Sequence, residues 1–264
     1  MRIGDLDVVP LSDGTYRMAQ DFYVGLDFAA HPEMLADDGR VPIPIGCFLV
    51  RGAGRIVLVD AGVGRIQAGA WGHGGQLPAG LASAGVAPAD IDTVVCTHLH
   101  IDHIGWLVDD GKPYFPNATV RYGSGDWAPF VESPDERDRG RHIMETLQDA
   151  GRLEPIDADM TAISPGITAR HTPGHTPGHY GLVLSSGAER AYVLGDAVEC
   201  PLQLSEPEFH ALSDVDPSLA ARTRETLWRE LEGSPTVMTG AHFPGLAFGR
   251  VVTTSGRRWF APID

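Results

Sequence analysis

The sequence has few cysteines and a shortage of basic side chains. Cys47, Cys96 and Cys200 are spread over 264 residues, and an odd number at such spacings provides neither a disulfide framework nor a CxxC metal knuckle. Lys and Arg number 20 against 35 Asp and Glu, which leaves a formal net charge of -15. Because nucleic acid is bound by clustered Lys and Arg, this balance predicts that the protein has no nucleic-acid partner.

Long apolar runs are scarce as well. The sequence has no stretch apolar enough to cross a bilayer. Asp5 and Asp7 lie where a secretory signal would have basic residues followed by an apolar run. We therefore expect a reduced, cytoplasmic protein without a membrane partner. The length allows a large core, and we expect one compact domain over residues 1–264.

Residue patterns predict strands and helices along the whole chain. Two β-type runs at 47–51 and 55–60 flank a Gly-Ala-Gly turn and predict a hairpin. Residues 91–96 are apolar and β-branched, which is typical of a buried strand. A helix is predicted over 216–232, with Asp as its N-cap and Pro at its first position. Such a mixture indicates sheet layers covered by helices.

A dense group of metal-ligating residue types directly follows the strand at 91–96. His98, His100, Asp102 and His103 lie within six residues. Three imidazoles and a carboxylate cannot all find hydrogen-bond partners in an apolar core, whereas a divalent metal satisfies them together. This run predicts a metal site.

Three later groups add possible ligands. The repeat from His171 through His175 to His179 places an imidazole at each of two Thr-Pro-Gly turns. Asp196 ends a predicted strand, and His242 lies in a Gly-Ala-His-Phe-Pro segment. Taken singly, each has an ordinary structural interpretation as a turn, a cap or a buried histidine. Only the complete set points to metal binding.

In order and spacing, the four groups resemble the motifs of the metallo-β-lactamase superfamily, from about Asp60 to His242. The resemblance implies an α/β fold, a four-layer αββα sandwich of two mixed sheets packed face to face with helices outside. It also implies a two-metal centre. One metal would be held by His98, His100 and His175, the other by Asp102, His103 and His242, with Asp196 bridging them.

The same resemblance assigns supporting roles and a chemistry. Asp60 and His179 are expected to hold ligands in place from behind. The nitrogen-rich ligand sets suit two divalent ions, most simply zinc, with manganese, iron or cobalt as alternatives. A hydroxide bridging two such ions would attack an ester-like carbonyl, and Asp102 would help to protonate the leaving alkoxide.

Sequence features that this chain lacks argue against some branches of the superfamily. The classical zinc β-lactamases have a Cys where this chain has Asp196, and glyoxalase II has a glutathione-binding extension beyond the position of His242. The segments at 195–203 and 242–245 resemble lactonases and methyl parathion hydrolase-like enzymes. We therefore expect a lactonase, acting for example on N-acyl homoserine lactones in quorum quenching. Alternatives are an aryl ester or organophosphate hydrolase, a one-iron persulfide dioxygenase-like oxidoreductase, and a catalytically silent binding protein.

The substrate pocket is less defined. Acyl-homoserine lactonases place a Tyr a few residues after the bridging Asp to assist at the carbonyl, and this chain has Ala-Val-Glu-Cys at 197–200. The predicted lining of a pocket for a small hydrophobic substrate is Phe22, Tyr23, Trp106 and Phe243, with Trp106 foremost. Each of these could equally pack in the core or in a dimer interface. The resemblance further implies a homodimer.

Overall fold

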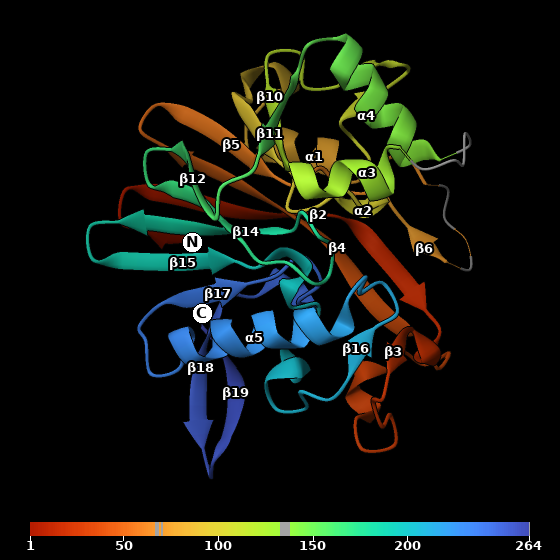
Figure 1. Ribbon diagram of the computed structural model, residues 1–264, viewed down its shortest axis with the longest axis vertical. Coiled ribbons are helices and arrows are strands. Elements are labelled where there is room, and N and C mark those ends of the chain that lie inside the picture. The colour runs from red at the N-terminus through yellow and green to blue at the C-terminus, as the bar shows by residue number, and fades with distance from the viewer. Residues whose placement is uncertain (67–68, 70, 133–137, 264) are drawn as a thin grey trace.

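The computed structural model describes residues 1–66, 69, 71–132 and 138–263. Within these residues, two large mixed sheets form the centre of the molecule (Figure 1). The first sheet runs in the order β1 (Arg2–Ile3), β2 (Leu6–Met18), β4 (Val41–Gly52), β5 (Arg55–Val59), β7 (Thr93–Val95), β10 (Thr119–Gly123) and β11 (Leu153–Ile156), and β6 (Gly72–His73) pairs with β2. The second runs in the order β12 (Met160–Ser164), β13 (Ile167–His171), β14 (Tyr180–Ser186), β15 (Glu189–Val193), β17 (Val237–Thr239), β18 (Gly249–Thr254) and β19 (Arg257–Pro262).

The remaining elements are short strands and helices. Two small antiparallel sheets pair β3 (Tyr23–Val24) with β16 (His210–Ala211) and β8 (Val108–Asp109) with β9 (Lys112–Pro113). The α-helices are α1 (Leu77–Ser83), α2 (Ile101–Ile104), α3 (Trp127–Phe130), α4 (Arg139–Asp149) and α5 (Pro217–Leu231). In Figure 1, α4 lies in the upper part of the view near β10 and β11, and α5 crosses the lower part beside β17 and β18.

Alternation along the strands builds the layers. In β4, Phe48 and Val50 pack into the core shared by the two sheets, whereas Cys47 and Leu49 pack into the core on the other face, against α1 and α4. Strand β15 alternates in the same way, and its Tyr192 packs towards α5. Helices therefore cover both outer faces, and the expected four-layer αββα sandwich is confirmed.

Several predicted elements are confirmed in detail. The hairpin is formed by β4 and β5, which pair antiparallel from Phe48–Val59 to Gly52–Arg55. The helix over 216–232 is α5, and the Asp216 side chain accepts a hydrogen bond from the Leu219 N–H at 2.8 Å, as an N-cap does. The buried strand predicted over 91–96 is β7.

The sequence patterns did not predict β2, a strand of 13 residues. It pairs with β4 along nearly its whole length, but its register shifts between Ser12 and Gly14. That bulge and the proline at position 10 interrupt the two-residue alternation by which strands are recognised. Beyond the bulge, β2 extends to the end of the sandwich where the predicted metal ligands lie.

The topology brings the ligand-bearing loops to one end of the sandwich. Strands β5, β7 and β10 run parallel in the first sheet, and β15 and β17 run parallel in the second. The loops that follow β7, β15 and β17 therefore leave from the carboxyl ends of strands, where functional residues are commonly found.

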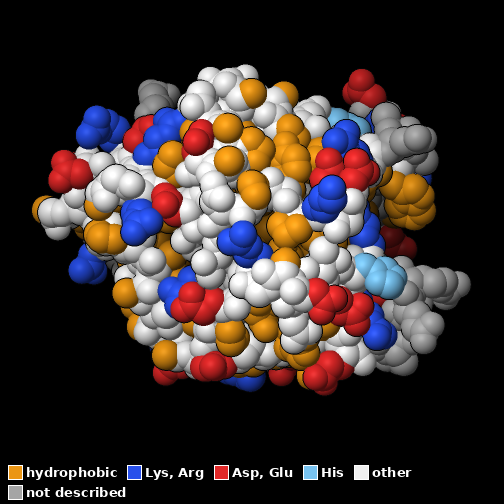
Figure 2. Space-filling view, turned by 90° about the horizontal axis from the view of Figure 1, so that it is seen from above, with side chains coloured by type: hydrophobic (Ala, Val, Ile, Leu, Met, Phe, Trp, Pro, Cys, Tyr) orange, Lys and Arg blue, Asp and Glu red, His pale blue; other side chains and the backbone are white. Residues whose placement is uncertain are grey.

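Among the described residues, no helix is both long enough and apolar enough to cross a membrane. Figure 2 shows a face on which basic and acidic side chains are interspersed.

Candidate metal centre

Three imidazoles converge on one point in the first part of the site. The Nε2 atom of His98 lies 2.9 Å from Nδ1 of His100, which lies 3.0 Å from Nε2 of His175. Burial and the neighbouring His103 hold the pKa of His98 well below its usual value, and burial and His175 lower the pKa of His100 to about 4. His98 and His100 are therefore neutral, the form in which imidazole binds a metal.

A carboxylate and two imidazoles form the second part. Asp102 and His103 lie on α2, and His242 lies in the turn after β17. The Oδ2 atom of Asp102 is 3.6 Å from His103 Nε2 and 3.5 Å from His242 Nε2. Although burial acts to lower it, the pKa of His242 is raised to about 9, chiefly because of Asp196. At neutral pH the His242 imidazole therefore keeps its proton, and a divalent ion bound there would replace that proton.

Asp196 joins the two groups. Its Oδ2 atom lies 3.0 Å from His242 Nε2, 3.4 Å from His103 Nε2 and 3.5 Å from His175 Nε2. Its Oδ1 atom and the Nε2 atom of His103 are buried and have no hydrogen-bond partner. Because an unpartnered buried polar atom costs about 1–3 kcal/mol, these atoms fit a bound cation much better than an apolar core. The donor set therefore fits two divalent metals.

The second ring nitrogen of the imidazoles is held from behind. An N–H at Nδ1 can donate to a fixed acceptor, which sets the ring orientation and leaves Nε2 free for a metal. The acceptors are Asp60 for His103 at 2.9 Å, Asp214 for His175 at 2.9 Å, and the Pro44 carbonyl for His242 at 2.6 Å.

Asp60 lies behind His103, where the sequence interpretation expects it. Its backbone is in the left-handed region, with φ of 60°, and its carboxylate accepts hydrogen bonds from the Thr97 N–H at 2.7 Å and the Thr97 hydroxyl at 2.9 Å. These bonds tie the end of β5 to the loop that begins the metal run. Such strain at a strand end is retained where surrounding bonds over-determine it.

His179 supports Asp196 and does not join either imidazole group. Its Nε2 accepts a hydrogen bond from the Asp196 backbone N–H at 3.0 Å, and its Nδ1 lies 2.8 Å from the Thr172 hydroxyl. The residue before Asp196 is Gly195, with φ of 54°. A Cβ there would lie 2.8 Å from His179 Nε2, so only glycine allows this close approach. His171 bonds to the Pro177 carbonyl and is structural.

A cavity of about 250 Å³ opens over the two groups. Four of the predicted ligands, His100, Asp102, Asp196 and His242, lie in its wall. The other lining residues are Tyr16, Met18, Phe22, Ile43, Ile101, Glu199 and Ser213. The cavity wall therefore combines apolar side chains with the carboxyl groups of Asp102, Asp196 and Glu199.

Of the aromatic residues predicted for the pocket, the structure places Phe22 in the lining and corrects the other three. Trp106 is 2% exposed in the core, where its indole N–H donates to Asp13 at 2.8 Å. Tyr23 packs edge to face with Phe209, and Phe243 with Phe260. Large aromatic side chains are drawn into whichever apolar cluster is nearest, and nearness to a metal motif along the chain does not redirect them.

The sequence interpretation missed six lining residues, which are Tyr16, Met18, Ile43, Ile101, Glu199 and Ser213. Burial, and after it the charge of Asp102, raises the pKa of Tyr16 far above its usual range, so its phenol keeps its proton. No sequence signal identified Tyr16, because the bulged strand that carries it was not predicted. Glu199 lies in the segment 197–200, where the resemblance to lactonases points only to a missing tyrosine.

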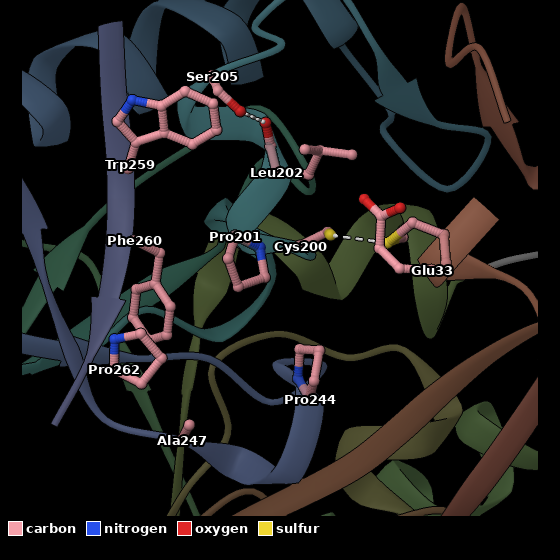
Figure 3. Close-up of a pocket in the computed structure, with 11 residues that line it drawn as sticks. Glu33, Cys200, Pro201, Leu202, Ser205, Pro244, Ala247, Trp259, Phe260 and Pro262 are labelled. Atoms are coloured by element: carbon pink, nitrogen blue, oxygen red, sulfur yellow. Dashed lines mark hydrogen bonds between the residues drawn. The ribbon is translucent and has the colours of Figure 1, made fainter. Parts of the chain in front are cut away.

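A second cavity, of about 300 Å³, has Cys200 and Pro244 in its wall (Figure 3). Figure 3 shows prolines and the Trp259 and Phe260 side chains around it, the latter two on the final strand β19. None of its lining residues belongs to a metal-binding group found among the described residues. Each of those groups has at least one member in the wall of the first cavity.

Comparisons with known proteins agree with this geometry. The structure is similar to the hydrolase AbOPH of the beta lactamase superfamily, with a TM-score of 0.85 and 25% identity over 100% of this chain and 96% of that one. It shares its fold with AidC, a dizinc quorum-quenching lactonase solved with a product, with a TM-score of 0.88 and 22% identity over 100% and 96% of the two chains.

A curated human relative, metallo-beta-lactamase domain-containing protein 1, is 32% identical over 171 residues. That match covers 64% of this chain and 52% of the human protein, so the aligned region spans about half the length of this relative. The family model for the metallo-beta-lactamase superfamily matches residues 41–238, which include six of the seven predicted ligands. With the αββα layers and the convergence of those side chains, this match shows that the chain belongs to the metallo-beta-lactamase superfamily.

Proposed function

We propose that the protein is a two-metal hydrolase that opens lactones, such as N-acyl homoserine lactones, or cleaves related hydrophobic esters. The observation that carries this proposal is the pair of three-residue groups, each with ligand atoms within 4.8 Å of one another, that Asp196 joins. His98, His100 and His175 would hold one ion, and Asp102, His103 and His242 the other. Zinc is the simplest occupant of such nitrogen-rich sites.

Divalent ions bound there would supply Lewis acidity, which polarises a carbonyl and activates water at neutral pH. The protein's own groups account for orientation and proton transfer. The phenol of Tyr16, protonated in the cavity wall, is a hydrogen-bond donor for a carbonyl oxygen. Asp102 turns Oδ2 towards His103 and His242, which leaves Oδ1 to take a proton from the attacking water and pass it to the leaving alkoxide.

The cavity favours a small neutral substrate with an apolar part. Met18, Phe22 and Ile43 are among its lining residues, and a short acyl chain packed against them would be removed from water at about 25 cal/mol per Å². AidC, which shares the fold, is described with a lactone-derived product bound. This is why lactones are the first substrates to test, ahead of aryl esters and phosphotriesters.

The second ligand group argues against the one-iron oxidoreductase. A mononuclear centre would need only His98, His100 and His175 with their neighbours, and would leave His103 Nε2 and one oxygen of Asp196 buried without partners. A second ion satisfies both atoms. Retention of a complete second group likewise disfavours a silent binding protein.

Metal analysis followed by a substrate panel tests the proposal. We expect about two divalent ions per chain and turnover of acyl-homoserine, γ- or δ-lactones, which an Asp196→Asn variant should lack. The substrate assignment is wrong if no lactone is opened while an aryl ester or phosphotriester is cleaved well. The hydrolase assignment is wrong if the protein holds one iron and consumes oxygen with glutathione persulfide.

A further inference from the structure

Asp126 is a fully buried carboxylate that belongs to none of the metal-binding groups found among the described residues. It lies in the 3₁₀ turn η4 (Ser124–Asp126), which follows β10 in the first sheet. Its Oδ2 accepts hydrogen bonds from the Leu99 N–H at 3.1 Å and the Thr176 hydroxyl at 2.9 Å. Its Oδ1 accepts one from the Gly178 N–H at 2.6 Å. None of these bonds goes to a proposed ligand, yet each donor lies close to one along the chain.

The donors come from the two loops that carry the first ligand group, which is His98, His100 and His175. Leu99 separates the first two of these histidines in the loop after β7. Thr176 directly follows the third, in the loop between β13 and β14. Asp126 therefore joins a loop of the first sheet to a loop of the second. Because each imidazole nitrogen must come within about 2 Å of an ion, the spacing of these loops decides whether all three rings reach it.

The backbone of η4 also approaches the second loop closely. A Cβ on Gly178 would lie 2.6 Å from the Asp126 backbone nitrogen and 2.6 Å from the Gly123 carbonyl oxygen. Only glycine allows this approach, so the turn and the loop pack together without a side chain between them. The ring of Phe130, on α3, lies edge to face against His100 with ring centroids 5.1 Å apart. The segment from β10 to α3 therefore contacts both loops.

Asp60 holds the second ligand group, which is Asp102, His103 and His242, in a comparable way. It lies 2.9 Å from Nδ1 of His103 and accepts from the N–H and hydroxyl of Thr97. These bonds lie within one loop, whereas those of Asp126 join two. The two buried carboxylates thus support different ligand groups.

We infer that Asp126 is the positioning residue of the first ligand group. By fixing the loop of His98 and His100 against the loop of His175, it sets the affinity of that group for a divalent cation and leaves the second ligand group nearly unchanged. The inference rests on the proposed two-metal function. It goes beyond that function by giving a role to a residue that supplies no ligand atom.

The size of the effect follows from the bonds that remain. The Tyr180 N–H donates to the Thr97 carbonyl at 2.7 Å and also joins the two loops, so loss of one oxygen of Asp126 should loosen the first ligand group without separating it. In Asp126→Asn an NH₂ group faces at least one N–H that needs an acceptor. We expect the affinity of the first ligand group for zinc to fall about 10- to 100-fold, as it does when other residues that orient ligands are changed.

Zinc binding measured at each ligand group provides the test. Crystals are equilibrated with zinc at a concentration that just fills both groups of the wild-type protein, and anomalous scattering gives the occupancy of each. In Asp126→Asn we expect zinc to be depleted from the first ligand group and retained by the second. Asp60→Asn should show the reverse pattern. Equal depletion of both groups in Asp126→Asn, or no depletion, overturns the inference.

Further variants separate positioning from general stability. Asp13→Asn alters a buried carboxylate that accepts from backbone N–H groups outside both ligand groups, and it should lower the Tm without changing zinc occupancy. Thr176→Val removes one donor to Asp126 and should deplete the first ligand group less than Asp126→Asn, whereas Thr176→Ser keeps the hydroxyl and should bind zinc as the wild type does. If Asp126→Asn does not fold, the Thr176 pair decides: depletion in Thr176→Val alone supports the inference, and equal binding by both overturns it.

Hydrogen exchange of the metal-free protein tests the structural cause. Protection of the amides of Leu99 and Gly178 should fall together in Asp126→Asn, and unchanged protection contradicts the inference. A lower Tm with the wild-type zinc pattern would make Asp126 purely structural and would also overturn it. The proposed function is judged by turnover: a protein that opens no lactone contradicts that proposal, while the zinc pattern still decides the role of Asp126.

Discussion

Asp13 and Asp196 are both buried carboxylates, and their surroundings differ completely. Asp13, on β2, is fully buried and accepts hydrogen bonds from the N–H groups of Val63, Gly64 and Leu77 and from the Trp106 indole, at 2.7–3.0 Å. Asp196 lies in the wall of the first cavity. One of its carboxylate oxygens lies near three imidazoles, and its other carboxylate oxygen has no hydrogen-bond partner.

This difference separates two uses of a buried charge. The bonds of Asp13 are complete within the protein, so they hold Val63, Gly64 and Leu77 against β2 and contribute to stability. The bonds of Asp196 are incomplete, which is what the proposed function expects of a residue that would bind a cation. Substitutions at the two positions should therefore act on different measurements.

The largest effect is expected from Asp196→Asn. The amide cannot bridge two cations as a carboxylate does, so we expect less metal per chain and a kcat/KM for lactones lower by at least about 1,000-fold. Metal analysis and steady-state kinetics measure the two losses. In the metal-free protein, the Tm should change less than it does for Asp13→Asn; a larger change there would mean that Asp196 is chiefly structural.

Asp13→Asn tests the other side of the comparison. An amide NH₂ replaces one acceptor oxygen and faces N–H groups that need an acceptor, so the free energy of unfolding should fall by about 3 kcal/mol. Chemical denaturation measures it. The folded fraction should keep its metal and its kcat, because Asp13 does not line the cavity. A loss of kcat without loss of stability would contradict this assignment.

Asp214 is intermediate between the two, and Asp214→Asn should sharpen the comparison. Its Oδ1 accepts from His175 Nδ1, and its Oδ2 lies 3.4 Å from an Arg224 nitrogen. Weakening the hold on His175 should lower metal affinity about 10- to 100-fold. Competition with a chelator measures this affinity. Unchanged affinity with lowered stability would place Asp214 with Asp13.

The smallest effect is expected on the helix surface far from either carboxylate. Arg229 on α5 donates to Glu225 at 2.7 Å, the i,i+4 pair on an exposed face. Arg229→Ala should lower the free energy of unfolding by only about 0.3 kcal/mol. Metal content and kinetics should match those of the wild-type protein. A change in either would show that α5 is coupled to the site through Asp214 and Arg224.

Local patterns were sufficient to predict the first run of metal-ligating residues and several strands and helices. His98 to His103 lie within one short segment, whereas the resemblance to the family selected His175 among the three histidines at the Thr-Pro-Gly turns. The alternation in β4 and the caps of α5 are likewise readable along the chain. Family spacing then added Asp196 and His242, which no local pattern distinguishes from an ordinary cap or a buried histidine.

Most of the residues that line the cavity could not be predicted from local sequence patterns. Trp106 follows the metal-ligating run by three residues, yet its side chain is buried in the core. There its indole N–H donates to Asp13, which lies 93 residues earlier in the chain. Tyr16 reaches the cavity on a bulged strand, and Glu199 is held there by Ser213.

What the sequence by itself determined is therefore the chemistry: which residues can ligate a metal, because ligand type and short spacing are covalent properties of the chain. What only the tertiary structure decided is the occupancy of the space around them. An aromatic or a carboxylate takes the cavity wall or the core according to which partners from distant segments surround it, and those partners, such as Asp13 for Trp106 and Ser213 for Glu199, are set by packing of the whole fold.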